Sequence, residues 1–282
     1  MTPLRFGLKL SQNATIDQLR ELWLLADDGG FDSCWVMDHF ATLGPRDDGA
    51  IFETWTMLAA MAQLTTRTRI GCMVVGNTYR HPGVLAKMAV TVDHLSAGRL
   101  EFGIGAGWAE PEHTMLGLEF GTAKDRADRL EESLQVILGL WTSPRTTFEG
   151  RHYRLTDAVA EPKPVQRPHP PIWVGGSGPR RTLRLAAQHA DVWNAAGGTP
   201  QEFAESSRIL DQHCADVGRD PDEIRRSVQL GVGADDVDGL EALVEPYVAV
   251  GATDLVLIVR GEDPLGIAER VTERLPRLRE LG

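Results

Sequence analysis

The sequence has few features that would support a disulfide or zinc framework. Its 282 residues include three cysteines, Cys34, Cys72 and Cys214, which lie far apart and form no Cys-x-x-Cys pair. We expect them to be small buried side chains. No apolar run approaches the length of a membrane span, and the first residues lack the basic segment and apolar stretch of a secretory signal. These absences predict a cytoplasmic protein without a structural metal or a membrane partner.

Positive charge is also scarce. The chain has 29 Lys and Arg residues against 40 Asp and Glu, a formal net charge of −11. This balance argues against a nucleic-acid partner and against attraction to an anionic membrane surface. Any anionic ligand must be held by local groups, for which Arg80, Arg180 and Arg181 are candidates. The apolar content of 42% is that of an ordinary globular chain with a large core.

A glycine-rich segment near the middle of the chain has the layout of a phosphate-binding turn. The apolar run Ile172–Val174 is followed by Gly175-Gly176-Ser177-Gly178, then by Pro179 in a first-turn position and a helix-like segment at 180–187. Glycines let backbone N–H groups approach an anion, and a helix start adds positive partial charge. The spacing matches neither a dinucleotide fingerprint nor a nucleotide-triphosphate loop, and a plain tight turn is the alternative.

Short apolar strands and amphipathic helices alternate along the whole chain. This pattern favours an α/β fold, a (β/α)8 TIM barrel formed by one domain over 1–282, with a doubly wound open sheet as the alternative. Segment 142–170 breaks the alternation. We interpret it as an insertion before the fifth strand, with a small hairpin over the barrel mouth. The strands are predicted near 4–10, 32–37, 69–75, 100–104, 172–175, 191–194, 227–232 and 253–259.

In such a barrel, the residues that follow each strand carry the chemistry. Here they are polar or glycine-rich, and the ordered set resembles the bacterial luciferase-like superfamily, most closely its oxidoreductases that use the deazaflavin coenzyme F420 (the LLM class). The resemblance runs in order from the first strand to beyond residue 220. The segments that carry it are 30–40, with Asp38-His39; 78–82 and 86–89; 96–108; and 171–176.

The resemblance implies a deazaflavin ring in the barrel mouth, with the cofactor phosphate near the glycine turn. It also implies a non-proline cis peptide at Met73-Val74 behind the ring, and a homodimer. The activity implied is hydride transfer between F420 and a small organic substrate. The cofactor-binding residues implied are Asp38, His39, Met73, Val74, Gly76, Asn77, Gly105, Gly107, Trp108, Gly175, Gly176, Ser177 and Gly178.

Asp38 and His39 are the candidate catalytic residues, because they follow a strand that is predicted to be buried. An imidazole can take or release a proton near neutral pH as hydride moves. The alternative is a hydrogen-bonded histidine that only shapes the ring pocket. Two other functions remain open: an FMN-dependent monooxygenase, which the wider superfamily includes, and a barrel that binds cofactor without catalysis.

The segment Gly105-Ala106-Gly107-Trp108 departs from the branch of the family that oxidises a sugar phosphate. That branch carries a glutamate after the Gly-x-Gly, which this chain lacks. The indole of Trp108 is expected either to wall the substrate space or to pack in the core. Glu110, Glu112 and His113 match no metal motif, and we expect them to be solvated loop charges.

Overall fold

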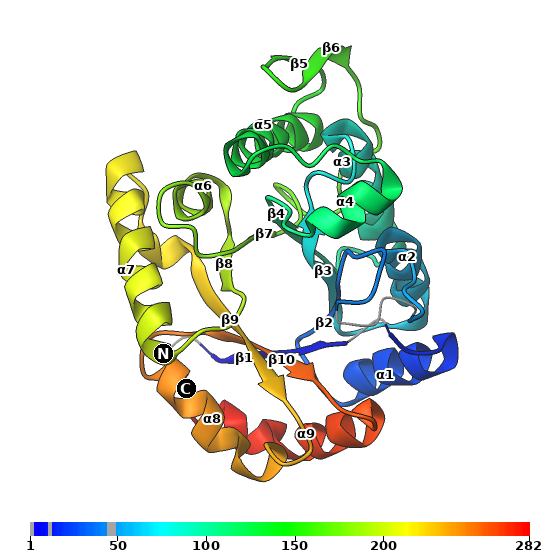
Figure 1. The fold of residues 1–282 in the computed structure, drawn as a ribbon, viewed down its shortest axis with the longest axis vertical. Helices are drawn as coiled ribbons and strands as arrows, with labels where there is room; N and C mark the ends of the chain where they lie inside the picture. The colour runs from blue at the N-terminus through cyan, green and yellow to red at the C-terminus, as the bar shows by residue number, and fades with distance from the viewer. Residues whose placement is uncertain (1–2, 11–12, 44–48) are drawn as a thin grey trace.

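The computed structural model describes residues 3–10, 13–43 and 49–282. Eight parallel strands close into a barrel in the order β1-β10-β9-β8-β7-β4-β3-β2, with the helices outside it (Figure 1). The predicted strands are all present, so the TIM barrel is confirmed and the open sheet is wrong. The barrel strands are β1 (Arg5–Lys9), β2 (Ser33–Val36), β3 (Arg69–Gly76), β4 (Leu100–Gly105), β7 (Ile172–Gly175), β8 (Val192–Ala195), β9 (Arg225–Val232) and β10 (Asp254–Val259).

The helices connect these strands and cover the outside of the barrel. Several begin at a capping box, as α1 does where Thr15 and Gln18 cap each other's backbone N–H groups. No helix in the described part of the chain is long and apolar enough to cross a membrane. The helices are α1 (Ile16–Asp28), α2 (Thr54–Leu64), α3 (Pro82–Leu95), α4 (Glu110–Leu116), α5 (Ala123–Thr142), α6 (Thr182–His189), α7 (Pro200–Val217), α8 (Leu240–Val248) and α9 (Pro264–Arg279), with short 3-10 turns at Pro221–Glu223 and Val237–Gly239.

Alternate residues of each strand face the helices or the barrel interior, as strand geometry requires. On β1, Phe6 and Leu8 belong to the main core beneath the helices. Gly7 faces inward, where a Cβ atom would lie 2.7 Å from the Trp35 indole nitrogen. Lys9, two residues on, lines a cavity at the carboxyl end of the barrel. The sequence of β1 therefore places a glycine and then a lysine inside the barrel.

Two tryptophans fill the middle of the barrel. Trp35 and Trp173 meet edge to face with ring centroids 4.6 Å apart. Trp35 donates its indole N–H to Ser33 Oγ at 2.8 Å, and Trp173 donates to Glu101. Because both rings are buried and both indole donors are satisfied, the interior is packed rather than open from end to end.

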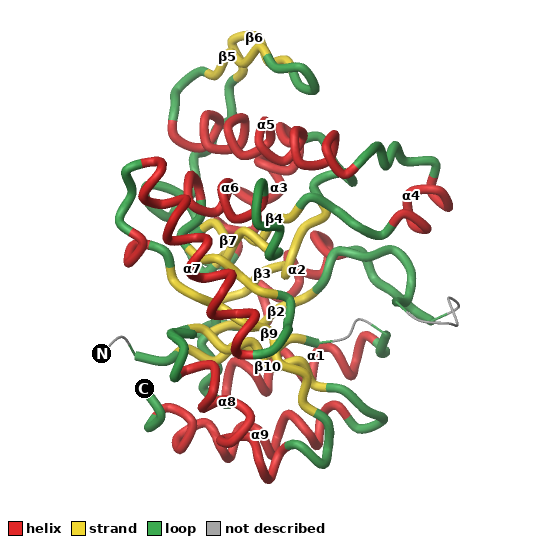
Figure 2. The backbone as a smooth tube through the Cα atoms, turned by 60° about the vertical axis from the view of Figure 1, so that its left-hand side comes forward, coloured by secondary structure: helices red, strands yellow, loops and turns green. Residues whose placement is uncertain are grey.

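The insertion at 142–170 contains the expected hairpin, formed by β5 (Thr146–Glu149) and β6 (Arg154–Ala158). Its expected place over the barrel mouth is wrong: the hairpin projects beyond α5, away from the barrel (Figure 2). The cause is Glu132 on α5, whose carboxylate accepts hydrogen bonds from the backbone N–H groups of Arg151, His152 and Tyr153 in the hairpin turn. These bonds hold the turn against the outer helix.

Candidate active site

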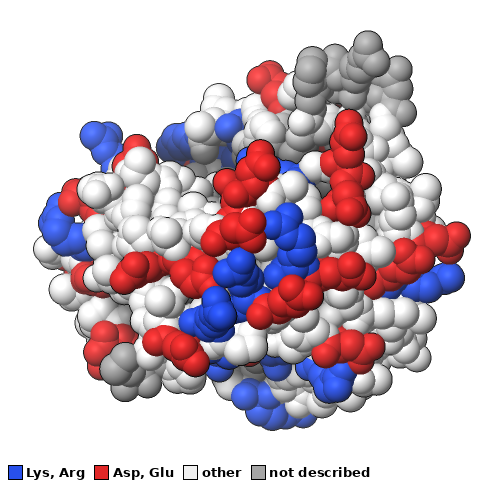
Figure 3. All heavy atoms as spheres, turned by 90° about the horizontal axis from the view of Figure 1, so that it is seen from below, with Lys and Arg blue, Asp and Glu red and all other residues white. Residues whose placement is uncertain are grey.

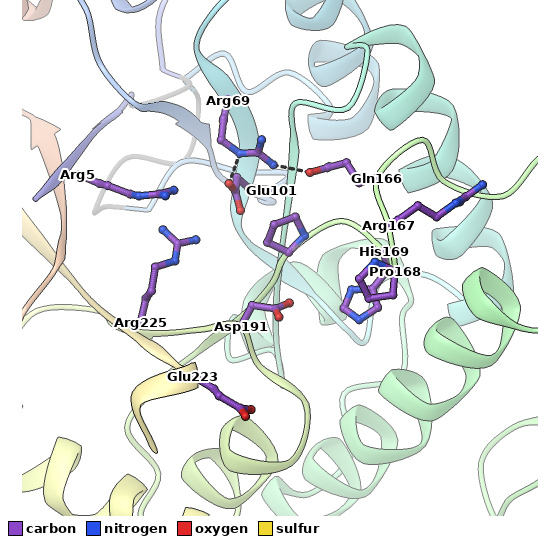
Figure 4. A pocket seen from close by; sticks show the side chains of 11 residues that line it. Arg5, Arg69, Glu101, Gln166, Arg167, Pro168, His169, Asp191, Glu223 and Arg225 are labelled. Atoms are coloured by element: carbon purple, nitrogen blue, oxygen red, sulfur yellow. Dashed lines mark hydrogen bonds and ion pairs between the residues drawn. The ribbon is translucent and has the colours of Figure 1, made fainter. Parts of the chain in front are cut away.

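A cavity lies at each end of the barrel. The cavity at the amino ends of the strands, about 450 Å³ in volume, is lined by several arginines (Figure 4). Two of them are neutralised: Arg69 bonds Glu101 and Gln166, and Arg225 lies 2.5 Å from Asp254. The cavity at the carboxyl ends, about 600 Å³, is the candidate active site because catalytic groups in such barrels follow the strands.

Most of the predicted cofactor residues line this carboxyl-end cavity. Three of the predicted residues do not: Asn77 is buried beside it, and Ser177 and Gly178 lie exposed further along the glycine turn. Lys9, Tyr79, Asn194, Gln229 and Arg260 also line it and were not among the predicted cofactor residues. The predicted residues that the structure brings to the cavity are Asp38, His39, Met73, Val74, Gly76, Gly105, Gly107, Trp108, Gly175 and Gly176.

One wall of the cavity is made by glycines packed against Val74. The peptide bond between Met73 and Val74 is cis, as the resemblance implied. A Cβ atom on Gly105 or Gly175 would lie 2.9 Å from a Val74 methyl group. Side chains at these two positions would therefore push Val74 out of place, and glycine keeps the wall flat.

The glycine turn leads from β7 to α6, but the helix begins later than predicted. Pro179 lies in a turn and α6 begins at Thr182, so the expectation of Pro179 in the first helical turn is wrong. Gly176 has a φ of +115°, which disfavours other residues, and its N–H is bonded to Asn194 O. No side chain caps α6, but the N–H of Leu183 is already bonded to Gly178 O, so an anion at the start of the helix has to be bound by the other first-turn N–H groups.

Asp38 forms a buried ion pair. Arg80 binds both of its carboxylate oxygens, at 2.7 and 3.0 Å, and also bonds Glu53 at 2.6 Å. The N–H of Gly76 donates to the same carboxylate at 3.1 Å. Burial raises the pKa of Asp38, and Arg80 opposes that rise. Arg80 is thus committed to two carboxylates, which removes it as a candidate for binding an anionic ligand.

His39 is held by Glu112, which the sequence analysis placed among solvated loop charges. That expectation is wrong, because Glu112 is 3% exposed and lies 2.8 Å from His39 Nδ1. It also accepts hydrogen bonds from the Tyr79 hydroxyl and from the N–H groups of Phe40 and Ala41. Burial alone would raise the pKa of Glu112, but these donors hold it below its usual value.

His113 was also expected to be solvated and is instead buried. Its Nδ1 bonds Ala109 O and its Nε2 bonds Thr78 Oγ1, each at 2.7 Å. These contacts fix α4 against the loop that follows β3. The first turn of α4 can then carry Glu112 to His39, a residue 73 positions earlier in the chain.

Trp108 stands at the rim of the cavity. Its side chain is 66% exposed, which excludes core packing, and its ring meets His39 edge to face at 5.5 Å. Trp23 and Trp55 belong to the main core, as the spacing of apolar residues predicts for Trp23. Two aromatic side chains, those of Tyr79 and Trp108, line the cavity.

Basic side chains on the outer surface are paired with acidic ones on one face of the molecule and near the glycine turn. On the face covered by α8 and α9, basic and acidic side chains are interspersed (Figure 3). Arg270 and Arg274, for example, both pair with Asp238. Near the glycine turn, Arg181 pairs with acidic residues of α5, so it too is neutralised. Of the three arginines considered for binding an anion, Arg80 and Arg181 are paired with carboxylates, whereas Arg180 is exposed and forms no ion pair with the described residues.

Comparison with known proteins decides the family. A family model described as luciferase-like monooxygenase matches residues 1–274. The chain belongs to this luciferase-like family. An F420-dependent glucose-6-phosphate dehydrogenase of Microbacterium testaceum is one of its curated relatives. The two sequences are 35% identical over a region that covers 82% of this chain and 68% of the relative. A phthiodiolone/phenolphthiodiolone dimycocerosates ketoreductase of Mycobacterium bovis is 32% identical to this chain, over 84% of this chain and 68% of the ketoreductase.

A solved structure has the same fold. It is an F420-dependent secondary alcohol dehydrogenase in complex with an F420-acetone adduct, with a TM-score of 0.86 at 19% identity, covering 98% of this chain and 99% of that one.

Proposed function

We propose that this chain is an F420-dependent oxidoreductase that moves hydride between the deazaflavin and a small organic substrate, with His39 as the proton-transferring group. The observation that carries the proposal is the buried Glu112–His39 pair at the edge of a glycine-walled cavity. The relatives named as F420-dependent dehydrogenases support the cofactor. Because Asp38 is paired with Arg80, we propose that it holds the loop that carries His39 and does not itself exchange a proton.

The residues present fit such a cofactor. The cavity volume lies within the usual range for ligand pockets. The wall at Gly105 and Gly175, flat against Val74, suits a planar ring, since a Cβ atom would occupy that space. The uncapped start of α6 suits a phosphate. We propose that Gly176, Ser177 and Gly178 hold the phosphate, while Met73, Val74, Gly76, Gly105, Gly107 and Trp108 surround the ring and Asn77 supports it from behind.

When bound, the deazaflavin supplies two-electron hydride chemistry. The protein supplies the proton. An ionised carboxylate only accepts hydrogen bonds, so Glu112 fixes the neutral His39 tautomer with its proton on Nδ1. Nε2, which has no hydrogen-bond partner among the described residues, then takes the hydroxyl proton of an alcohol, or returns it to a carbonyl oxygen in the reverse direction. Glu112 stabilises the imidazolium that forms.

The first experiment titrates the purified protein with F420 and, separately, with FMN, following fluorescence. We expect F420 to bind more tightly. Preference for FMN would replace the proposal with a flavin-dependent monooxygenase. Retention of F420 with no hydride exchange across a panel of alcohols and carbonyl compounds would indicate a non-catalytic barrel. We further propose that the enzyme is a cytoplasmic homodimer; sedimentation of the F420 complex tests the dimer, and cell fractionation tests the location.

The glycine turn makes a separate prediction. Gly176→Asp is expected to weaken F420 binding at least about tenfold, because it places a negative charge and a strained residue where the phosphate binds. The matched control is Gly251→Asp, at a glycine of similar φ (+96°) with open space around it and outside the cavity. Equal F420 affinities for the two variants would remove the phosphate from this turn.

A further inference from the structure

A lysine lies deep in the candidate active site. Lys9 ends β1, lines the carboxyl-end cavity, and donates from Nζ to Gln229 Oε1 at 2.6 Å. The amide of Gln229 donates in turn to Asn194 Oδ1 at 2.8 Å, and Asn194 donates to Ser227 Oγ at 2.9 Å. Because an ammonium group only donates hydrogen bonds, the Gln229 oxygen must face Lys9. The network therefore fixes where the ammonium group lies.

This ammonium group has no negative partner. In the described part of the chain, no carboxylate lies within 4 Å of Lys9 Nζ, and none pairs with Arg260, which lines the same cavity from the end of β10. Burial lowers the pKa of Lys9 to about 8; Arg260 also lowers it and Cys72 opposes. The unpaired charge of Lys9 is unfavourable in this partly buried position unless an anion neutralises it, whereas Arg260 is exposed and its charge is solvated.

The position of this wall indicates what it faces. In the closed barrel, β9, β10 and β1 lie across from β3, β4 and β7, which carry Val74 and the two glycines of the wall. A ring lying against Val74 has its other face toward Lys9 and Arg260. The cofactor phosphate has its own candidate position at the glycine turn after β7. The cationic wall is thus on the side where a substrate would sit.

We propose that Lys9 and Arg260 bind an oxyanion of the substrate, a carboxylate or a phosphate, and so select substrates that carry one. The subsite rests on the proposed function for the statement that its ligand is the substrate. Lys9 contacts the ligand directly, while Gln229 and Asn194 are positioning residues that act through Lys9. Neutral alcohols would enter the cavity without this contact.

Calorimetric titration of the F420 complex with sodium acetate and, separately, sodium sulfate tests the subsite. Acetate represents a carboxylate, and sulfate represents a phosphate without changing charge between pH 7 and 9. Lys9→Met is expected to weaken binding of the preferred anion at least tenfold while leaving F420 affinity within about twofold. The less buried Arg260→Gln is expected to weaken it about three- to tenfold. The anion that binds more tightly identifies the substrate's oxyanion.

The matched control is Arg5→Gln, which removes a cation from the amino-end cavity and should leave anion affinity unchanged. The proposal would be overturned if the wild-type protein bound neither anion. It would also be overturned if Arg5→Gln lowered anion affinity as much as Lys9→Met does. A Lys9→Met variant that loses F420 instead of the anion would overturn it as well, because Lys9 would then serve the cofactor. Failure of F420 to bind any variant would count against the proposed function and not against the subsite.

The pH dependence provides a second test. Since Lys9 loses its charge above about pH 8, anion affinity should fall about five- to tenfold between pH 7 and 9 in the wild type and stay flat in Lys9→Met. Other groups near Lys9 are Arg260 on β10, Cys72 on β3, and Asp38 and His39 after β2. Cys72 has its pKa raised well above its usual value by burial, and Asp38 is paired. The same titration with His39→Ala shows how much of the pH dependence comes from the histidine. A wild-type anion affinity that does not change between pH 7 and 9 would contradict the assignment of the pH dependence to Lys9.

Discussion

His39→Ala is expected to lower kcat by about 10²- to 10⁴-fold, the usual contribution of a general acid–base group. The imidazole is the group at the cavity edge with one nitrogen fixed by a carboxylate and the other free among the described residues. F420 affinity should change far less, because the ring also lies against Val74 and the glycine wall. Steady-state kinetics with a reactive alcohol or carbonyl compound, together with the F420 titration, separates the two effects.

Two further variants show whether the histidine transfers a proton or only shapes the pocket. Added imidazole should restore part of the activity of His39→Ala, which a purely structural role would not allow. Glu112→Gln should lower kcat about 10- to 100-fold, because it removes the charge that stabilises the imidazolium. His94→Ala, at an exposed histidine, is the control and should have wild-type kinetics. Full activity in His39→Ala would leave the histidine as a pocket residue.

Arg80→Met is expected to reduce the free energy of unfolding by about 3–5 kcal/mol, because it leaves the Asp38 carboxylate buried without its partner. The Asp38 side chain is 1% exposed, so water cannot replace the guanidinium. Denaturant unfolding, followed by fluorescence, measures the loss. The double variant Asp38→Asn with Arg80→Met should recover part of it, because the carboxylate that then remains without Arg80 is that of Glu53, which is 37% exposed to water.

The control for this prediction is Arg145→Met, which breaks a surface pair. Arg145 and Asp157 are 62% and 63% exposed, so its loss should cost about 0–1 kcal/mol. If Arg80→Met cost no more than Arg145→Met, the buried pair would contribute little to stability, and the burial of Asp38 would need another explanation.

The barrel could be predicted from the sequence because its strands are short apolar runs that lie between helices with clear boundaries. The predicted strand at 172–175 matches β7, and that at 100–104 differs from β4 by one residue. These signals are local, since alternation and capping residues act over a few positions. The cis peptide at Met73-Val74 had no such signal and came from the family resemblance alone.

The parts of the site that depend on contacts between distant segments were not predictable. Glu112 resembles a solvated charge in its own segment, and only the packing of α4 on the loops after β2 and β3 buries it. The hairpin was expected over the mouth, but Glu132 on the outer helix binds its turn. Lys9 was assigned to a strand, yet nothing nearby in the sequence indicates that its partner is Gln229. Residues at such separations meet only once the barrel closes.

The tryptophan pair inside the barrel also governs the order in which ligands move. Trp35 and Trp173 pack between the two cavities, so ligands do not pass through the barrel from one cavity to the other. Whichever ligand binds deeper has to arrive first and leave last. Ordered turnover would then follow from two indoles that touch neither reactant, and product-inhibition patterns would report it.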